Sequence, residues 1–261
     1  MQVQGARICK GRLLCHAAHV VRKVVMQNPL RLIYPHHCLT CDTLTGGPDA
    51  LCGDCWGEVS FLNGSVCGKC GAQVMSEVDG MQCDDCLHAP RLWSAGRSVF
   101  HYSGFGRRMV LGIKHGDRLD LVRPAAKWMA QHARLLRRDN MLVVPIPLHW
   151  SRLFGRRYNQ SAELARGISQ QMGLQYGPDI LQRPKRTPML EGKTRDDRLN
   201  ILSGAITVNP KRALNIVQRP ILLVDDVMTT GATLAEAANA LASSRAGEVF
   251  VITLARAGKD T

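Results

Sequence analysis

The chain has 261 residues, a length that allows one large domain or two, and 45% of its residues are apolar. This apolar share suffices for a buried core and excludes a wholly disordered chain. Its longest apolar runs, such as residues 221–224, fall far short of the roughly 18 residues that a membrane-spanning helix needs. No apolar segment is followed by a small-residue cleavage site, so the sequence predicts a cytoplasmic protein without a membrane span.

The net charge of +13 is concentrated in the middle of the chain. Residues 91–219 hold 24 basic and 8 acidic residues, whereas residues 1–90 hold 7 and 8, and residues 220–261 hold 3 and 5. Arginine, which can bind two phosphate oxygens at once, outnumbers lysine in the middle segment. This excess indicates a polyanionic ligand, either nucleic acid or a phosphorylated small molecule, although a basic surface that only aids solubility would give the same count.

Near the N-terminus, residues 7–27 have the pattern of a basic amphipathic helix. Ile8, Leu14, Val21 and Val25 recur at helical spacing, and five basic residues accompany them without an acidic one. The pattern fits a helix packed on its own protein, a helix at a membrane surface, or a transit peptide.

Eight of the ten cysteines form four Cys-x-x-Cys pairs within 49 residues. The two-residue spacer lets both thiolates of a pair reach one metal ion, and two pairs complete a tetrahedral all-thiolate site, so we expect two structural zinc ions. A crossed assignment of the pairs is compatible with the spacing. The simplest assignment is sequential, with Cys38, Cys41, Cys52 and Cys55 on one zinc and Cys67, Cys70, Cys83 and Cys86 on the other.

Residues 38–90 depend on metal more than on a hydrophobic core, because they contain little aliphatic material and many turn residues. A segment this short gains only about a few kcal/mol from burial. A structural zinc contributes on the order of 10–16 kcal/mol in small peptides. Disulfides are the rival interpretation, and a reducing cytosol disfavours them. The sequence therefore predicts a double zinc ribbon over residues 38–90.

From residue 97 onward, short apolar runs alternate with segments of helical period. We expect strands at residues 97–102, 141–146, 220–225 and 248–254, and helices at residues 119–136, 158–172 and 233–244. This alternation predicts an α/β fold with a Rossmann-like parallel sheet. Ligands of such sheets bind at the carboxyl ends of the strands, so the loops that follow the strands are the candidate sites.

The most informative loop follows the apolar run 221–224. Asp225 and Asp226 end this predicted strand, where unpaired charge is costly unless a ligand or a cation meets it. Small hydroxyl residues and glycine come next, and the N–H groups of such a turn and of the following helix form an anion cradle. Carboxylates beside an anion cradle suit a sugar phosphate, and a plain turn with a helix cap is the alternative.

Residues 221–233, with the sequence ILLVDDVMTTGAT, resemble the phosphoribosyl pyrophosphate (PRPP) motif of type I phosphoribosyltransferases. The resemblance implies a fold of that kind, with PRPP bound together with Mg²⁺ and with the ribose hydroxyls on Asp225 and Asp226. It implies that the 5-phosphate is held by Thr229, Thr230, Gly231, Ala232 and Thr233. It further implies that the loop after residues 141–146 binds pyrophosphate, with His149 and Arg152 as ligands and Arg156 and Arg157 as further candidates. The polar segment 183–200 resembles the flexible loop that closes over such sites.

The order of the motifs narrows this resemblance. The four Cys-x-x-Cys pairs precede Tyr102-x-Gly104…Arg108…Lys114, then residues 144–152, then Arg157-Tyr158-Asn159-Gln160 and the PRPP motif. This order is similar to that of the ComF family of ComFC- and GntX-like proteins, over about residues 30–256. The resemblance implies a phosphoribosyltransferase of unknown acceptor that releases pyrophosphate, and a link to DNA uptake in natural transformation or to DNA utilisation. Its catalytic residues would be Asp225, Asp226, Arg152 and Lys114.

The predicted domains are a basic N-terminal segment (1–37), a double zinc ribbon (38–90) and a phosphoribosyltransferase-like domain (91–261). Two other kinds of function fit the same residues. One is a module that binds single-stranded DNA through the zinc knuckles and the arginine-rich middle, with a PRPP site that is sensory or catalytically silent. The other is an adaptor whose ribbon docks competence or DNA-uptake proteins. The salt dependence of DNA affinity and the release of pyrophosphate from PRPP would separate these functions.

Overall fold

The computed structural model describes residues 34–75, 80–115, 118–151, 153, 157–188 and 195–258. The chain divides into two compact units, residues 1–52 and 53–261. The helix predicted at residues 7–27 lies outside the described residues, as do Arg152, Arg156 and residues 189–194. Within the described residues, every helix is too short or too polar to cross a membrane.

The described part of the first unit is a tight turn around the first cysteine pair. The backbone N–H of Cys38 donates to the carbonyl of Thr43 at 2.7 Å, and an antiparallel bridge joins His37 to Leu44. The backbone N–H of Cys52 donates to Cys38 Sγ at 3.3 Å. These bonds shape a knuckle that turns its thiols toward one point.

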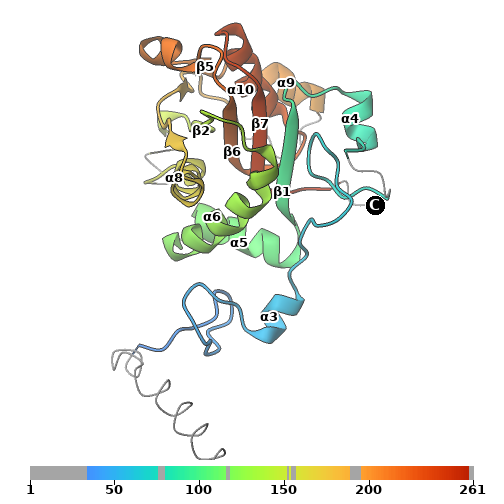
Figure 1. Ribbon diagram of the computed structural model, residues 1–261, viewed down its shortest axis with the longest axis vertical. Helices are drawn as coiled ribbons and strands as arrows, with labels where there is room; N and C mark the ends of the chain where they lie inside the picture. The colour runs from blue at the N-terminus through green and yellow to red at the C-terminus, as the bar shows by residue number, and fades with distance from the viewer. Residues whose placement is uncertain are drawn as a thin grey trace, which may run out of the picture. The chain divides into compact units, whose positions relative to one another are not determined.

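A five-stranded parallel sheet forms the centre of the second unit, in the order β1-β7-β6-β2-β3. Strands β1, β7, β6 and β2 are labelled in Figure 1. Every residue of β7 and the first four residues of β6 are buried, as expected for strands that are covered on both faces. The predicted α/β class with a parallel sheet is confirmed. The strands are β1 (Ala95–His101), β2 (Leu142–Pro145), β3 (Gln175–Tyr176), β6 (Ile221–Met228) and β7 (Val249–Arg256), and a separate antiparallel pair consists of β4 (Leu181–Gln182) and β5 (Thr207–Val208).

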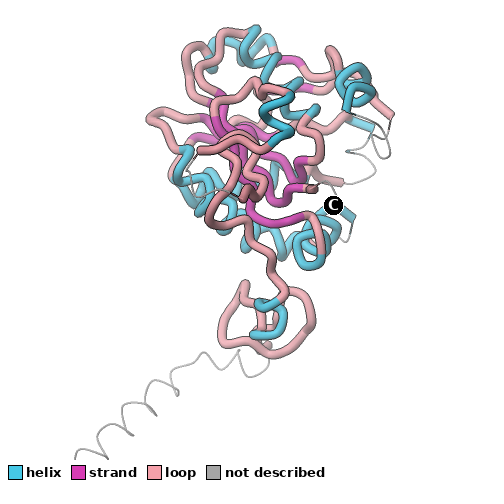
Figure 2. The backbone as a smooth tube through the Cα atoms, turned by 90° about the vertical axis from the view of Figure 1, so that its right-hand side faces the viewer, coloured by secondary structure: helices cyan, strands magenta, loops and turns pink. Residues whose placement is uncertain are grey.

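Helices cover both faces of this sheet, as the backbone trace also shows (Figure 2). Helix α10 (Ala232–Ser243) packs through Leu234, Ala237 and Leu241 against one set of alternating strand residues, Val144, Leu223 and Val251 among them. Side chains alternate along a strand, so the residues between these face the other side. That side is covered by α5 (Gly104–His115), α6 (Val122–Ala133) and α8 (Gln160–Met172).

Among the described residues, the other helical segments with assigned bounds are short. They are α3 (Gly53–Gly57), α4 (Asp84–His88), α9 (Arg195–Leu202) and the 3₁₀ turns η1 (Leu119–Leu121), η2 (Arg134–Leu136) and η3 (Pro210–Ile216).

Three elements differ from the sequence-based expectation. Strand β6 continues to Met228, so Asp225 and Asp226 lie within the strand and not at its end. The backbone pairs of Val227 and Met228 with β7 extend the strand beyond the acids. Helix α9 occupies part of the segment 183–200, which was expected to be a flexible loop, and α5 was not predicted. The buried residues of α5 (Phe105, Met109, Val110 and Ile113) have helical spacing, so its signal was present in the sequence.

The strand order reverses between β2 and β6. These two strands are neighbours, but the chain continues from β2 outward to β3 and from β6 in the other direction to β7. In doubly wound sheets, ligands bind at the carboxyl ends of the strands on either side of such a reversal. The fold therefore places the loop after β6 and the loop after β2 where a ligand is expected.

Candidate active site and zinc centres

The eight paired cysteines form two quartets, and the sequential assignment is the one observed. Within each quartet the four sulfur atoms lie within 4.8 Å of one another. The Sγ atoms of Cys41 and Cys52 are 3.5 Å apart, as are those of Cys70 and Cys83, and none of the eight cysteines is in a disulfide. Four thiolates around a zinc ion at about 2.3 Å would be about 3.8 Å apart. Both quartets therefore fit a structural zinc ion held by four cysteines.

The second quartet, Cys67, Cys70, Cys83 and Cys86, lies against the core of the α/β unit. Cys67, Cys70 and Cys86 are buried in one hydrophobic cluster with Trp93 and with side chains of α10. The indole N–H of Trp93 donates to the carbonyl of Lys69, which lies between Cys67 and Cys70. Closeness to β1 requires glycine at position 71, because a Cβ there would lie 2.5 Å from the backbone N of Ser98. The second quartet is thus packed into the core of the α/β unit.

Asp225 and Asp226 are held by side chains from α5 and α8. Gln160 Nε2 donates to Asp226 Oδ2 at 3.0 Å, and Lys114 Nζ lies 3.1 Å from the same oxygen. Ser161 Oγ donates to Asp225 Oδ1 at 2.9 Å. Lys114 lies in the last turn of α5, whereas Gln160 and Ser161 begin α8, so two helices from separate parts of the chain converge on the acids of β6. The structure places the predicted residue Lys114 directly beside the predicted acid pair.

The surroundings of the acid pair favour the protonated, uncharged form of Asp225. Burial, and next the charge of Asp226, raise the pKa of Asp225 from 3.8 to about 7, although the hydrogen bond from Ser161 acts in the opposite direction. At neutral pH this carboxyl is therefore only partly ionised. A cation or a pair of hydroxyl donors beside it would favour the ionised form.

The start of α8 is fixed by its N-cap, Asn159. The side-chain oxygen of Asn159 accepts from the backbone N–H of Ser161 at 3.0 Å, and its Nδ2 donates to the carbonyl of Ile146 at 3.0 Å. An N-cap of this kind stabilises a helix by about 1 kcal/mol. Here it also joins the helix that holds the acids to the loop after β2.

The loop after β6 has the geometry of an anion cradle. Gly231 is the N-cap of α10 with φ of +79°, a left-handed conformation that favours glycine. The first N–H groups of a helix lack partners within it and carry partial positive charge. Arg198 Nη1 donates to Thr229 Oγ1 at 2.6 Å. A small pocket lies at this place, and its lining includes Asp225, Thr229, Thr230, Gly231, Ala232, Thr233 and Arg198.

The loop after β2 carries His149, which is 5% exposed. The backbone N–H of Ser151 donates to His149 Nδ1 at 3.2 Å, so in the neutral ring the proton lies on Nε2. The ring of Trp150 is tilted by 40° to that of His149, with centroids 5.3 Å apart, and Trp150 is 64% exposed. The predicted pyrophosphate ligand Arg152 lies outside the described residues, so its role stays a prediction.

Sequence reasoning missed several residues of this region. Gln160 belonged to a recognised motif but had no assigned role, and Ser161 and Arg198 had no signal beyond a polar side chain. Arg91 and Arg256 were also missed, although each donates to a carbonyl of the loop after β6. Contacts of this kind join residues far apart in the chain, 139 positions in the case of Arg91 and Thr230, and leave no local pattern.

Comparison with known proteins supports the double zinc ribbon and the resemblance of most of the chain to competence and DNA utilization proteins. The family model of the double zinc ribbon domain matches residues 29–87. Competence protein F of Haemophilus influenzae is 26% identical over 84% of this chain and 96% of that protein. The DNA utilization protein YhgH of Salmonella typhimurium is 29% identical over 74% of this chain and 84% of that protein, and Competence protein ComFC of Bacillus subtilis is 25% identical over 84% and 94%. The double zinc ribbon and the resemblance to the ComF family are thereby confirmed.

Among solved structures, the crystal structure of TT1426 from Thermus thermophilus is similar at a TM-score of 0.33 and 15% identity, over 54% of this chain and 85% of that chain.

Proposed function

We propose that this chain, a homologue of competence protein F and ComFC, binds PRPP at the loop after β6 and transfers its phosphoribosyl group with release of pyrophosphate. The names of its relatives link it to competence and DNA utilisation, so we propose that the reaction serves DNA uptake or the use of DNA. The observation that carries the proposal is the acid pair on β6 beside an anion cradle, at the reversal of a parallel sheet.

Each part of PRPP has a counterpart in this arrangement. The N–H groups of the loop and the hydroxyls of Thr229, Thr230 and Thr233 would hold the 5-phosphate. The carboxylates of Asp225 and Asp226 would accept hydrogen bonds from the ribose hydroxyls in place of those from Ser161 and Gln160. The leaving pyrophosphate carries several negative charges. Mg²⁺ would enter with it to offset them, because magnesium usually binds phosphates together with one or two carboxylates.

The chemistry follows from these contacts. The bond between C1 of the ribose and the pyrophosphate oxygen breaks, the pyrophosphate leaves with the electron pair, and a nitrogen nucleophile forms the new bond to C1. A transition state of this kind resembles an oxocarbenium ion. Lys114, 3.1 Å from Asp226, supplies a positive charge near the departing oxygens, and preorganised donors of this kind stabilise charge as it develops.

Calorimetric titration of PRPP with Mg²⁺ tests the proposal. We expect binding to the wild-type protein and a loss of binding in the double variant Asp225→Asn with Asp226→Asn, which keeps the shape of both side chains. Glu248→Gln is the matched control. This exposed carboxylate lies at the amino end of β7, whereas the acid pair lies toward the carboxyl ends of the strands. Equal affinity of the wild-type protein and the double variant would refute the ribose role. A screen for pyrophosphate release with candidate acceptors then tests turnover.

A second function is favoured by the basic middle segment, with its 24 basic against 8 acidic residues. In this alternative the chain binds single-stranded DNA as an adaptor of the uptake machinery, and PRPP is sensed without turnover. Affinity for DNA that falls steeply with salt, together with PRPP binding and no release of pyrophosphate with any acceptor, would support it.

A further inference from the structure

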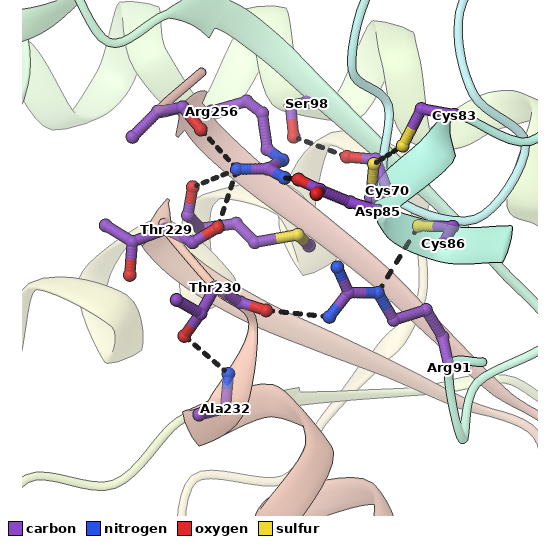
Figure 3. A network of polar contacts seen from close by, with 12 residues as sticks. Cys70, Cys83, Asp85, Cys86, Arg91, Ser98, Thr229, Thr230, Ala232 and Arg256 are labelled. Atoms are coloured by element: carbon purple, nitrogen blue, oxygen red, sulfur yellow. Dashed lines mark hydrogen bonds and ion pairs between the residues drawn. The ribbon is translucent and has the colours of Figure 1, made fainter. Parts of the chain in front are cut away.

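Two arginines donate to successive carbonyls of the loop after β6, which we call the phosphate loop (Figure 3). Arg256 Nη1 donates to the carbonyl of Thr229 at 2.6 Å, and Arg91 Nη1 donates to the carbonyl of Thr230 at 2.7 Å. Arg256 ends β7 and is 4% exposed, whereas Arg91 follows the zinc ribbon. The loop is therefore gripped from its carbonyl side by two cations that belong to different parts of the unit.

This grip sets the direction of the loop's N–H groups. In a trans peptide the carbonyl and the following N–H point in opposite directions. Arg256 thus turns the N–H of Thr230 away from itself, and Arg91 does the same for the N–H of Gly231. A Cβ at Gly231 would lie 3.0 Å from Arg91 Nη1 and 3.2 Å from the ring of Trp93, so the guanidinium sits tightly behind the loop.

Both guanidinium groups also contact the last Cys-x-x-Cys pair of the second quartet, Cys83 and Cys86, or the residue beside it (Figure 3). Arg91 Nε donates to Cys86 Sγ at 3.3 Å, and Arg256 Nη2 lies 3.8 Å from Asp85 Oδ2. Asp85 and Cys86 are consecutive residues of α4. Donors to a ligating atom orient it and tune its hold on the metal. One short helix, fixed by the second quartet, therefore anchors both arginines.

We propose that Arg91 and Arg256 are positioning residues that couple the second cysteine quartet to the phosphate loop, so that zinc held by Cys67, Cys70, Cys83 and Cys86 and an anion held by the loop strengthen each other's binding. The proposal rests on the proposed PRPP site. Coupling between two sites is reciprocal in binding free energy, so PRPP must raise the affinity for this zinc by the same factor as this zinc raises the affinity for PRPP. We expect the more tightly held zinc to leave more slowly. The first quartet, Cys38, Cys41, Cys52 and Cys55, serves as the internal reference, because neither arginine is bonded to it in the described part of the chain.

The test measures zinc release from the full chain to a coloured chelator, with and without saturating PRPP and Mg²⁺. The variant Cys41→Ser, which disables the first quartet, identifies the release phase of the second. We expect PRPP to slow that phase by about fivefold or more, a typical size for coupling between sites, and to leave the phase of the first quartet unchanged.

Arg91→Lys removes the coupling but keeps the charge, because one ammonium group cannot replace the two diverging donors that reach Cys86 and Thr230. We expect this variant to retain two zinc ions, to bind PRPP about tenfold more weakly, and to release the second zinc at a rate that no longer depends on PRPP. Arg138→Lys is the matched control. Each arginine lies over an aromatic ring, Arg91 at 5.5 Å from the centroid of Trp93 and Arg138 at 4.6 Å from that of Phe250, but Arg138 lies near the amino end of β7.

The outcomes separate the two proposals. If PRPP binds the wild-type protein but leaves both release phases unchanged, the coupling is refuted and the PRPP site stands. The same holds if Arg91→Lys and Arg138→Lys behave alike. If PRPP does not bind the wild-type protein at all, the proposed function fails, and the coupling fails with it.

Discussion

Asp225 provides a direct test of the electrostatics of the site. Burial and the charge of Asp226 raise its pKa to about 7. In the unfolded chain the pKa of the same group is about 3.9. A carboxyl with a higher pKa in the folded state binds its proton more tightly there. Its contribution to stability is therefore greatest at low pH and is lost as the pH rises from about 4 through about 7.

The magnitude follows from these two pKa values. Between pH 6 and pH 8 the unfolded carboxyl is ionised throughout, whereas the folded one loses most of its proton. The free energy of unfolding of the wild-type protein should therefore fall by about 1–2 kcal/mol over this interval because of Asp225. Asp225→Asn cannot ionise, so it should lack this contribution. Its stability relative to the wild-type protein should rise by that amount from pH 6 to pH 8.

Urea unfolding at pH 6 and pH 8 measures the effect, with the zinc content kept constant. Titrating groups away from the acid pair contribute equally to both proteins and cancel in the difference. Glu248→Gln is the control, because this carboxylate has an exposed side chain, 3.8 Å from Arg138, and lies outside the site. Its pH profile should run parallel to that of the wild-type protein. If the profiles of Asp225→Asn and of the wild-type protein are also parallel, the pKa of Asp225 is not raised and the reasoning is refuted.

Three further predictions concern the same unit. Lys114→Met should lower the free energy of unfolding at pH 8 by about 1–3 kcal/mol, because it removes a charged partner from the buried Asp226, and unchanged stability in urea would contradict the ion pair. Gly231→Ala should cost about 1–2 kcal/mol from its positive φ and should also weaken PRPP binding by displacing Arg91. Gly173→Ala has φ of +63° with open space around its Cβ, so it should share the stability cost but keep PRPP affinity, and equal affinities of the two variants would count against the grip on the loop. Elemental analysis of protein purified without chelator should find about two zinc ions per chain, and a value near zero would exclude the structural zinc sites.

Much of the candidate site was visible in the sequence because its signals are local. The motif at residues 221–233 combines a strand, an acid pair and a helix start within one short segment, and the structure has the strand and the helix in these places. The end of the strand was not predictable in the same way. Val227 and Met228 continue β6 because β7 offers them backbone partners, Ala255 and Arg256, each 28 positions further along the chain.

The segment 183–200 shows the opposite limitation. Its polar residues have no helical period, so the sequence favoured a loop, yet residues 195–202 form α9. Contacts between α9 and α10 and the bond from Arg198 to Thr229 hold this helix beside the phosphate loop. Tertiary contacts of this kind override weak local preferences.

The sequence by itself determined the cysteine pairs, the alternation of strands and helices, and the loop after β6, because each depends on spacings of a few residues. Only the tertiary structure decided which cysteine pairs lie together and which side chains surround the acids. It also showed that Arg91 and Arg256 connect the second cysteine quartet to the loop after β6. The physical reason is the parallel sheet. Each crossover brings together segments that are far apart in the chain, and the long side chains that bridge them have no fixed spacing in the sequence.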